Sequence, residues 1–171
     1  MIDELTRKGL LDYIKPRFKL RWDGAHGISH WRRVESNGLL LCERTKANPR
    51  VIALFSLLHD ACRDNEYEDP DHGKRGADLA AHLHGKLFDA TSEELALLTS
   101  ACERHSLGLT KADVTIQTCW DADRLDLGRV GIKPHPKYLC TAAAKCACAT
   151  LPPKYQGVES YESAIIEPYD K

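Results

Sequence analysis

The segment "LFSLLHDACRD", residues 54–64, contains the residue pair best suited to chemistry. Its apolar run ends in His59 and Asp60 and then turns abruptly polar. Neighbouring residues on a helix point about 100° apart around its axis, yet both side chains can reach one ion seated beside the helix. An imidazole nitrogen and a carboxylate oxygen suit Mn, Fe, Zn, Ni or Mg when further nitrogen or oxygen ligands join them. The pair therefore predicts a divalent metal site, and the alternative is a buried histidine satisfied by a neighbouring carboxylate.

The elements that must position this pair are helices, because apolar residues recur at spacings of three and four along almost the whole chain. Helix starts are indicated by Ser29 as an N-cap, Pro49 in a first turn, a capping box from Thr91 to Glu94, and Asp113 as an N-cap. We expect helices over residues 3–15, 29–48, 49–61, 72–87, 90–106, 113–128 and 136–150, followed by an irregular tail from Pro152.

These helices predict an all-α, single-domain helical bundle of about six to seven helices. The chain has 171 residues, of which 43% are hydrophobic, and this is enough for one domain with its own core. We expect an N-terminal helix within residues 1–25, a core with the metal site over 26–130, and a C-terminal helix and tail packed on the same domain over 131–171.

The balance of charge argues against large charged partners. The formal net charge is −1, from 24 basic and 25 acidic residues, so we expect no nucleic-acid polymer and no membrane as partner. The start of the chain lacks the apolar run of a secretory signal, and no run approaches the roughly 20 residues that cross a bilayer, so we expect a cytoplasmic protein. The seven cysteines show no paired C-x-x-C spacing, and we interpret them as small apolar residues rather than disulfide partners or zinc ligands.

Motifs on both sides of the pair carry a resemblance to a known family. In order, they are "HWRRV" (His30 to Val34), "LLHD" (Leu57 to Asp60) and "DADRL" (Asp121 to Leu125). An H…HD…D order in an all-helical chain resembles the HD-domain superfamily of metal-dependent phosphohydrolases, and the resemblance covers roughly residues 26–130. It implies a bundle of the HD-domain type in which the metal ligands are His30, His59, Asp60 and Asp123. Spacing alone does not distinguish Asp123 from Asp121 or Asp126.

Two further histidines stand at positions that recur in the family. His72 begins "HGKRGADLA", which resembles the "HxxxGAxxA" helix of many HD proteins, and His105 ends "ACERHS". In two-metal relatives such histidines complete a second site in which the residue matching Asp60 bridges the ions, whereas in single-metal relatives they face the substrate phosphate. The sequence leaves both roles open, and we expect one strongly held ion, with His72 and His105 acting as catalytic donors to the phosphate.

The resemblance implies hydrolysis of a phosphate ester or anhydride, such as that of a nucleotide, by a metal-activated water. Developing negative charge needs cationic partners, and we expect Arg63, Lys74 and Arg75 to bind the phosphate of a small phosphorylated substrate. Some relatives carry an acidic residue three or four positions past the HD aspartate, where it orients or deprotonates the water. Here Arg63 stands at the third position and Asp64 at the fourth, a departure that leaves the general base open. We predict a catalytic role for Asp64, and one for Arg63 through its contact with the phosphate.

Several readings remain open at the level of sequence. The runner-up activity is an HD-type di-iron oxygenase, which uses the same six ligands, and a third hypothesis is a non-catalytic nucleotide-sensing module. His26, in the loop segment "WDGAHGISH", is a lesser candidate for contact with substrate, the alternative being an ordinary loop histidine. The residues fix neither the metal, nor whether one ion or two are bound, nor the oligomeric state.

Overall fold

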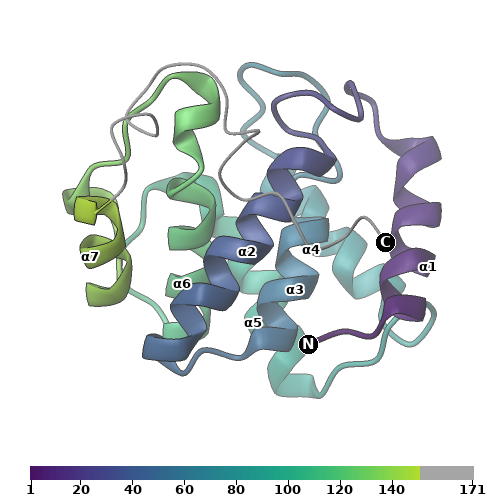
Figure 1. Ribbon diagram of the computed structural model, residues 1–171. Helices are drawn as coiled ribbons and strands as arrows, with labels where there is room; N and C mark the ends of the chain where they lie inside the picture. The colour runs from purple at the N-terminus through teal and green to yellow at the C-terminus, as the bar shows by residue number, and fades with distance from the viewer. Residues whose placement is uncertain (151–171) are drawn as a thin grey trace.

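The computed structural model describes residues 1–150, and over that range the chain forms seven α-helices and no β-strand (Figure 1). The helices are α1 (Glu4–Ile14), α2 (Ile28–Thr45), α3 (Pro49–Leu58), α4 (His72–Leu83), α5 (Ser92–Arg104), α6 (Val114–Arg124) and α7 (Ala142–Thr150). The expected all-α fold of six to seven helices is confirmed. None of the helices in residues 1–150 is both long and apolar enough to span a membrane. The tail expected from Pro152 lies outside the described residues.

Several helix ends follow the capping signals of the sequence. The side chain of Asn48 accepts hydrogen bonds at the start of α3, where Pro49 occupies the first turn, and the capping box of Thr91 and Glu94 begins α5. Asp113 caps α6 as expected. Ser29 is not the N-cap of α2, since that helix begins one residue earlier, after Gly27.

Gly27 is dictated by close packing rather than by capping. A Cβ atom at this position would lie 2.0 Å from the carbonyl oxygen of Trp22. The amide of Ile28 donates a 2.8 Å hydrogen bond to the same oxygen. The loop before α2 therefore folds back tightly on itself, and only glycine fits where the helix begins.

For two of the helices that are shorter than the sequence predicts, the backbone shows the cause. Helix α4 ends at Leu83 because His84 is extended and Gly85 has a φ of +73°, a conformation that glycine adopts readily. The last helix begins at Ala142 rather than at residue 136, because residues Pro136–Tyr138 form a separate 3-10 turn.

Helix α3 forms the centre of the core. Every residue from Val51 to Leu58 is buried, and the helix packs against α2, α4, α5 and α6. Burial of one large apolar side chain contributes about 1.5–3 kcal/mol, so this helix is strongly held in place. The predicted central buried helix is confirmed, and its rigidity fixes the position of His59 and Asp60 directly after its last residue.

Helix α4 packs unusually close to the same point. A Cβ atom on Gly76 would lie 2.8 Å from the carbonyl oxygen of Leu58 and 2.9 Å from that of His59. The glycine of the "HxxxGA" pattern therefore lets the backbone of α4 rest against the end of α3. This contact brings His72, in the first turn of α4, beside the HD pair.

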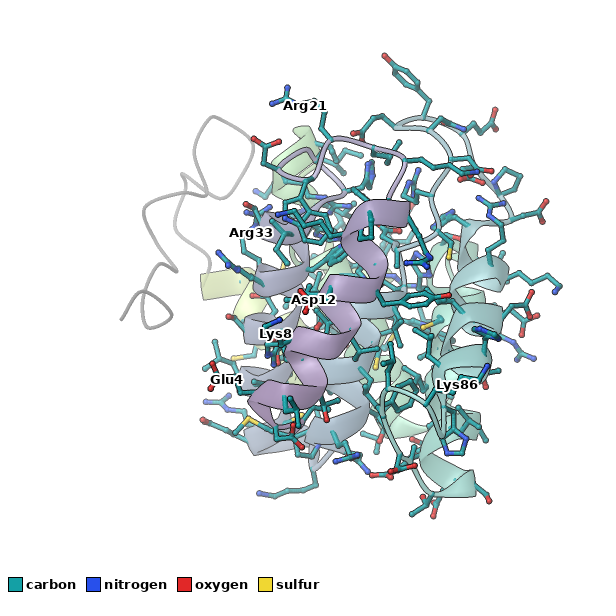
Figure 2. All side chains as sticks on the ribbon, turned by 90° about the vertical axis from the view of Figure 1, so that its right-hand side faces the viewer. Glu4, Lys8, Asp12, Arg21, Arg33 and Lys86 are labelled. Carbon is teal, nitrogen blue, oxygen red and sulfur yellow. The ribbon has the colours of Figure 1, made fainter. Side chains whose placement is uncertain are left out.

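Helix α1 lies on the outside of the bundle. Its residues Leu10 and Ile14 are buried, whereas Lys8 and Asp12 point outward from its exposed face (Figure 2). The ion pair between Lys8 and Asp12 is solvent-exposed, and such pairs contribute only about 0–1 kcal/mol. The helix is therefore attached through its apolar side, and its C-terminal end approaches the segment that follows the HD pair.

Candidate metal centre

Six side chains from five helix ends converge in the interior. Helices α2 and α4 supply residues from their first turns, α6 one from its last turn, and α3 and α5 residues that follow their last turns directly. Five of the six are at most 5% exposed, and the sixth, Asp123, is half-buried. The cluster consists of His30, His59, Asp60, His72, His105 and Asp123.

The two carboxylate oxygens of Asp60 divide this cluster into two halves. In the first half, Nε2 of His30 lies 3.1 Å from Nε2 of His59, and both lie 3.7 Å from Oδ2 of Asp60. Oδ1 of Asp123 lies 3.4 Å from Nε2 of His30. In the second half, Nε2 of His72 lies 2.9 Å from Nε2 of His105, and these atoms are 3.4 and 3.6 Å from Oδ1 of Asp60.

The hydrogen bonds of the four rings fix which nitrogen carries the proton. Each Nδ1 donates to an oxygen that can only accept: a carboxylate oxygen of Asp126 or the carbonyl oxygens of Phe55, Asp69 and Cys102. In a neutral ring the Nε2 atom therefore presents a lone pair to the cluster. The Nε2 lone pairs of His30 and His59 thus face one another on one side of Asp60, and those of His72 and His105 face one another on the other side. The buried Oδ1 atom of Asp60 has no hydrogen-bond partner. This set of nitrogen and oxygen donors fits divalent metal ions, with Asp60 placed to contact two of them.

The electrostatics of the first half favour neutral histidines. Burial lowers the pKa of His59, and it lowers that of His30 well below the usual range. Burial alone would raise the pKa of Asp60, but the surrounding histidines, His59 first, hold it well below the ordinary value. Neutral imidazole and ionised carboxylate are the forms that bind metals.

The second half differs in its charge. Burial lowers the pKa of His72. Burial also acts to lower the pKa of His105, but the adjacent carboxylate of Asp60, whose Oδ1 lies 3.6 Å from Nε2 of His105, outweighs it and raises that pKa above the usual value. In the second half, the facing Nε2 atoms of His72 and His105 can therefore bind either a shared proton or a metal ion.

The structure separates the three aspartates that spacing could not. Asp121 accepts hydrogen bonds from the backbone amides of Cys140 and Thr141 at 2.6 and 2.8 Å and so fastens the chain that leads to α7. Asp126 accepts the Nδ1 proton of His30 at 2.7 Å. Only Asp123, among these three, has an oxygen beside a cluster Nε2 atom.

Asp126 supports the cluster in a way that the sequence did not predict, as a hydrogen-bond acceptor rather than as a metal ligand. Besides orienting His30, it accepts hydrogen bonds from Nε and Nη2 of Arg33 at 2.7 and 3.1 Å. Arg33 is the second arginine of the "HWRRV" motif, and this contact gives that arginine a structural role next to His30. Arg33 was visible in the motif, but the sequence could not show its partner because Asp126 lies 93 residues away.

Two arginines border the cluster. Nη1 of Arg63 lies 3.7 Å from Oδ1 of Asp60 and donates to Nε2 of His72 at 3.3 Å. Backbone carbonyl groups hold the rest of its guanidinium. On the other side, Nη1 of Arg129 lies 3.9 Å from Oδ1 of Asp123, and its charge helps to lower the pKa of that carboxyl group against the effect of burial.

Three residues predicted to act on substrate lie outside the cluster. Lys74 is exposed and binds Asp78 at 2.8 Å, so the structure does not bring it to the site. Asp64 is 44% exposed and binds Lys19 at 2.6 Å, which leaves it without contact to the cluster. Arg75 donates to both oxygens of Asp69 at 2.7 Å.

A small pocket connects some of these residues. Its volume is about 210 Å³, and Arg63, Asp64 and Arg75 line it together with the apolar side chains of Ile14 and Leu79. Arg63 thus touches the cluster on one side and this pocket on the other. Of the residues predicted to act on substrate, Arg63, Asp64 and Arg75 therefore share this pocket, and among these three only Arg63 also contacts the cluster.

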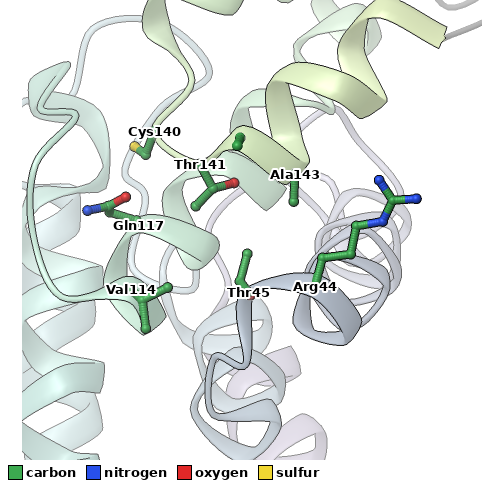
Figure 3. A pocket seen from close by; sticks show the side chains of 8 residues that line it. Arg44, Thr45, Val114, Gln117, Cys140, Thr141 and Ala143 are labelled. Atoms are coloured by element: carbon green, nitrogen blue, oxygen red, sulfur yellow. The ribbon is translucent and has the colours of Figure 1, made fainter.

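A second hollow lies elsewhere, between the end of α2 and the starts of α6 and α7 (Figure 3). Its volume is about 520 Å³, and its lining includes Arg44, Gln117 and Thr141 but no residue of the cluster. This hollow holds no histidine or carboxylate that could ligate a metal. Within residues 1–150, the buried groups of histidine and carboxylate that could hold a metal ion both lie in the cluster.

Comparison with known proteins agrees with this geometry. No protein-family model matches the chain. A solved structure, that of a predicted HD superfamily hydrolase from an uncultured Thermotogales bacterium, is 28% identical and superposes with a TM-score of 0.65. The match covers 83% of this chain and 82% of that one. The chain therefore has the HD-domain fold, and its resemblance to the HD-domain superfamily is confirmed.

Proposed function

We propose that this protein is a metal-dependent phosphohydrolase that cleaves an ester or anhydride bond in a small phosphorylated molecule. The observation that carries the proposal is the pair of facing Nε2 lone pairs arranged around the two oxygens of Asp60. The similarity to a predicted HD superfamily hydrolase supports a metal-dependent hydrolase as the general class. The phosphate substrate and the identity of the metal are the proposed parts.

The residues of the cluster form two sets of metal ligands that share Asp60. His30, His59, Asp60 and Asp123 would hold the first ion, and His72 and His105, with Asp60, would hold a second. A divalent ion bound there polarises a phosphoryl oxygen and makes a coordinated water more acidic. The lone pairs of His72 and His105 point at each other, which favours the ligand role over the donor role expected from the sequence.

Arg63 is the cation best placed to meet phosphate. Its Nη1 lies 3.7 Å from Oδ1 of Asp60, and the guanidinium is held by backbone carbonyl groups, so little reorientation is needed. A charge-assisted hydrogen bond to a phosphate oxygen contributes about 1.5–3 kcal/mol. The pocket of about 210 Å³ beside Arg63 and Arg75 offers space next to the site.

The experiment is a panel of nucleotides, sugar phosphates and aryl phosphates assayed for phosphate release with Mn²⁺, Mg²⁺, Ni²⁺ and Fe²⁺. We expect release that requires a divalent ion and stops when a chelator is added. Oxygen consumption by the iron-loaded protein without phosphate release would favour the oxygenase. Tight nucleotide binding without turnover under any metal would favour the sensing module. Either result would contradict the proposed function.

A further inference from the structure

A pocket with a surplus of positive charge lies next to the cluster. It is the hollow of about 210 Å³ enclosed by three segments: the end of α1 with the turn after it, the segment that follows the HD pair, and one face of α4. Asp64 supplies the one carboxylate of its lining, whereas four basic side chains line it, those of Arg17, Lys19, Arg63 and Arg75. A concave surface with more cations than acids favours an anionic occupant. We call this hollow the basic pocket.

Arg17 brings a charge to the basic pocket that no acid compensates. Its Nη1 donates a 2.8 Å hydrogen bond to the carbonyl oxygen of Tyr13, and its Cζ atom lies 4.0 Å from the centre of the Tyr13 ring. No carboxylate group among residues 1–150 forms an ion pair with it. Both contacts of Arg17 are to the end of its own helix, so they hold the guanidinium beside the pocket without fastening α1 to the rest of the molecule.

The ion pairs of two other cations in the basic pocket differ in strength. Lys19 lies 2.6 Å from Asp64, but 65% and 44% of these two side chains are exposed. Exposed ion pairs of this kind are weak, so Lys19 can turn from Asp64 to a phosphate group at little cost. Arg75 is held more firmly, because its Nη2 atom donates to both oxygens of Asp69 at 2.7 Å. Of these three cations, Arg17 and Lys19 are therefore the most available to a ligand.

The basic pocket also has an apolar wall that begins beside the cluster. Ala61, which lines the pocket, directly follows Asp60 in the chain, and consecutive Cα atoms are about 3.8 Å apart. Arg63 contacts Asp60 through its Nη1 and lines the pocket as well. Ile14 and Leu79 add further apolar surface. A molecule with a phosphate group at the cluster can thus lay a short carbon chain along this wall and reach the cations of the pocket.

We propose that the basic pocket binds a second anionic group of the substrate. The preferred substrates then carry two phosphate groups, or a phosphate and a carboxylate, at the two ends of a short carbon skeleton. The phosphate at the metal centre is cleaved, and the pocket holds the other group. Arg17 is the main specificity-determining residue, and Lys19 assists it. This inference deepens the proposed function and rests on it.

The experiment measures binding rather than turnover, with phosphonates that cannot be hydrolysed. Propane-, butane- and hexane-diphosphonate carry two anionic groups at increasing separation, and each is compared with the alkylphosphonate of the same length. We measure the Kd of each compound for the protein in saturating Mn²⁺ by isothermal titration calorimetry. Charge-assisted contacts to cations that are partly screened by solvent favour an anion by roughly tenfold in Kd, so we expect the best diphosphonate to bind about tenfold tighter than its alkylphosphonate.

Three variants assign this advantage to residues. We expect Arg17→Gln to reduce it to a few-fold and the double variant Arg17→Gln with Lys19→Gln to remove it, while both variants bind the alkylphosphonates as wild type does. Lys15→Gln is the matched control, because Lys15 lies in the same 3-10 turn as Arg17 and is exposed but does not line the pocket. It should keep the full advantage.

The outcomes separate this inference from the proposed function. An advantage that falls in Arg17→Gln and persists in Lys15→Gln supports the inference. Equal affinity of wild type for the two kinds of phosphonate, or an advantage that Arg17→Gln retains in full, would overturn it and leave the phosphohydrolase proposal standing. Absence of phosphate release across the substrate panel would instead overturn the proposed function, and with it the inference about the substrate.

Discussion

The two halves of the cluster share one aspartate but differ in charge. In the first half, two neutral histidines and Asp123 join Oδ2 of Asp60, and no N–H group donates to either facing Nε2 atom within residues 1–150. In the second half no further carboxylate is present, and Arg63 donates to Nε2 of His72. The first half therefore offers two carboxylates and two facing lone pairs, with Arg129 3.9 Å from Asp123 at its edge, whereas in the second half an arginine already donates to one of the lone pairs. We therefore expect the two halves to differ in metal affinity although the geometry of their ligands is similar.

The largest effect should come from the residue common to both halves. We expect Asp60→Asn to reduce bound metal from both halves and to abolish turnover, because one substitution removes the charge that both Nε2 pairs surround. The side chain keeps its shape, so the helices should persist by circular dichroism. Elemental analysis of the purified variant checks this, and full metal occupancy would show that the cluster is not the metal site.

The next prediction tests the halves separately. We expect His59→Gln to lose the tightly held ion, whereas His105→Gln should keep it and lose only the weaker one. The reason is that the first half retains Asp123 and neutral His30 when the second half is damaged. Metal titration by calorimetry on both variants measures this, with His82→Gln on the exposed surface of α4 as the control. Equal loss in the two variants would remove the distinction between the halves.

A third prediction concerns the arginine that borders the second half. Arg63→Gln removes a positive charge 3.7 Å from Oδ1 of Asp60, and we expect tighter binding of the second ion together with turnover lower by about ten- to a hundredfold. Arg63→Lys keeps the charge but not the forked geometry of the guanidinium, so its turnover should lie between that of wild type and that of Arg63→Gln. Unchanged turnover in Arg63→Gln would reduce the residue to a structural support of its loop.

The two halves should also respond differently to pH. The pKa of His105 is raised in the metal-free fold, so at a pH below that value a proton occupies the second half and competes with the metal. The pKa of His30 is lowered well below its usual value, so the first half stays free of protons over the same range. We expect the second equivalent of metal to be lost first as the pH falls, whereas the first is retained. Equilibrium dialysis across that range checks this, and simultaneous loss of both equivalents would contradict it.

Much of this arrangement could be predicted from the sequence, and the failures have physical causes. The ligands of the first half follow from motifs that lie on helices with clear caps and apolar faces. Because these apolar faces pack into one core, the motif side chains next to them are brought together there. The role of Asp126 could not be found because it depends on contacts to residues 93 and 96 positions away. The pair of His26 and Glu66 joins two irregular loops across 40 residues, and no periodicity describes such loops.

The smallest expected effect lies on α4, where two neighbouring basic residues were predicted to bind phosphate. Arg75 lines the pocket beside Arg63, but its guanidinium already binds Asp69, whereas Lys74 is exposed and paired with Asp78. Adjacent helical positions point about 100° apart, so the sequence alone could not assign them to different surfaces. We expect Arg75→Gln to weaken substrate binding a few-fold, measured as KM, and Lys74→Gln to leave KM unchanged because its exposed ion pair is worth about 0–1 kcal/mol. A larger effect from Lys74→Gln than from Arg75→Gln would mean that the substrate approaches along the outer surface of α4 rather than past the pocket.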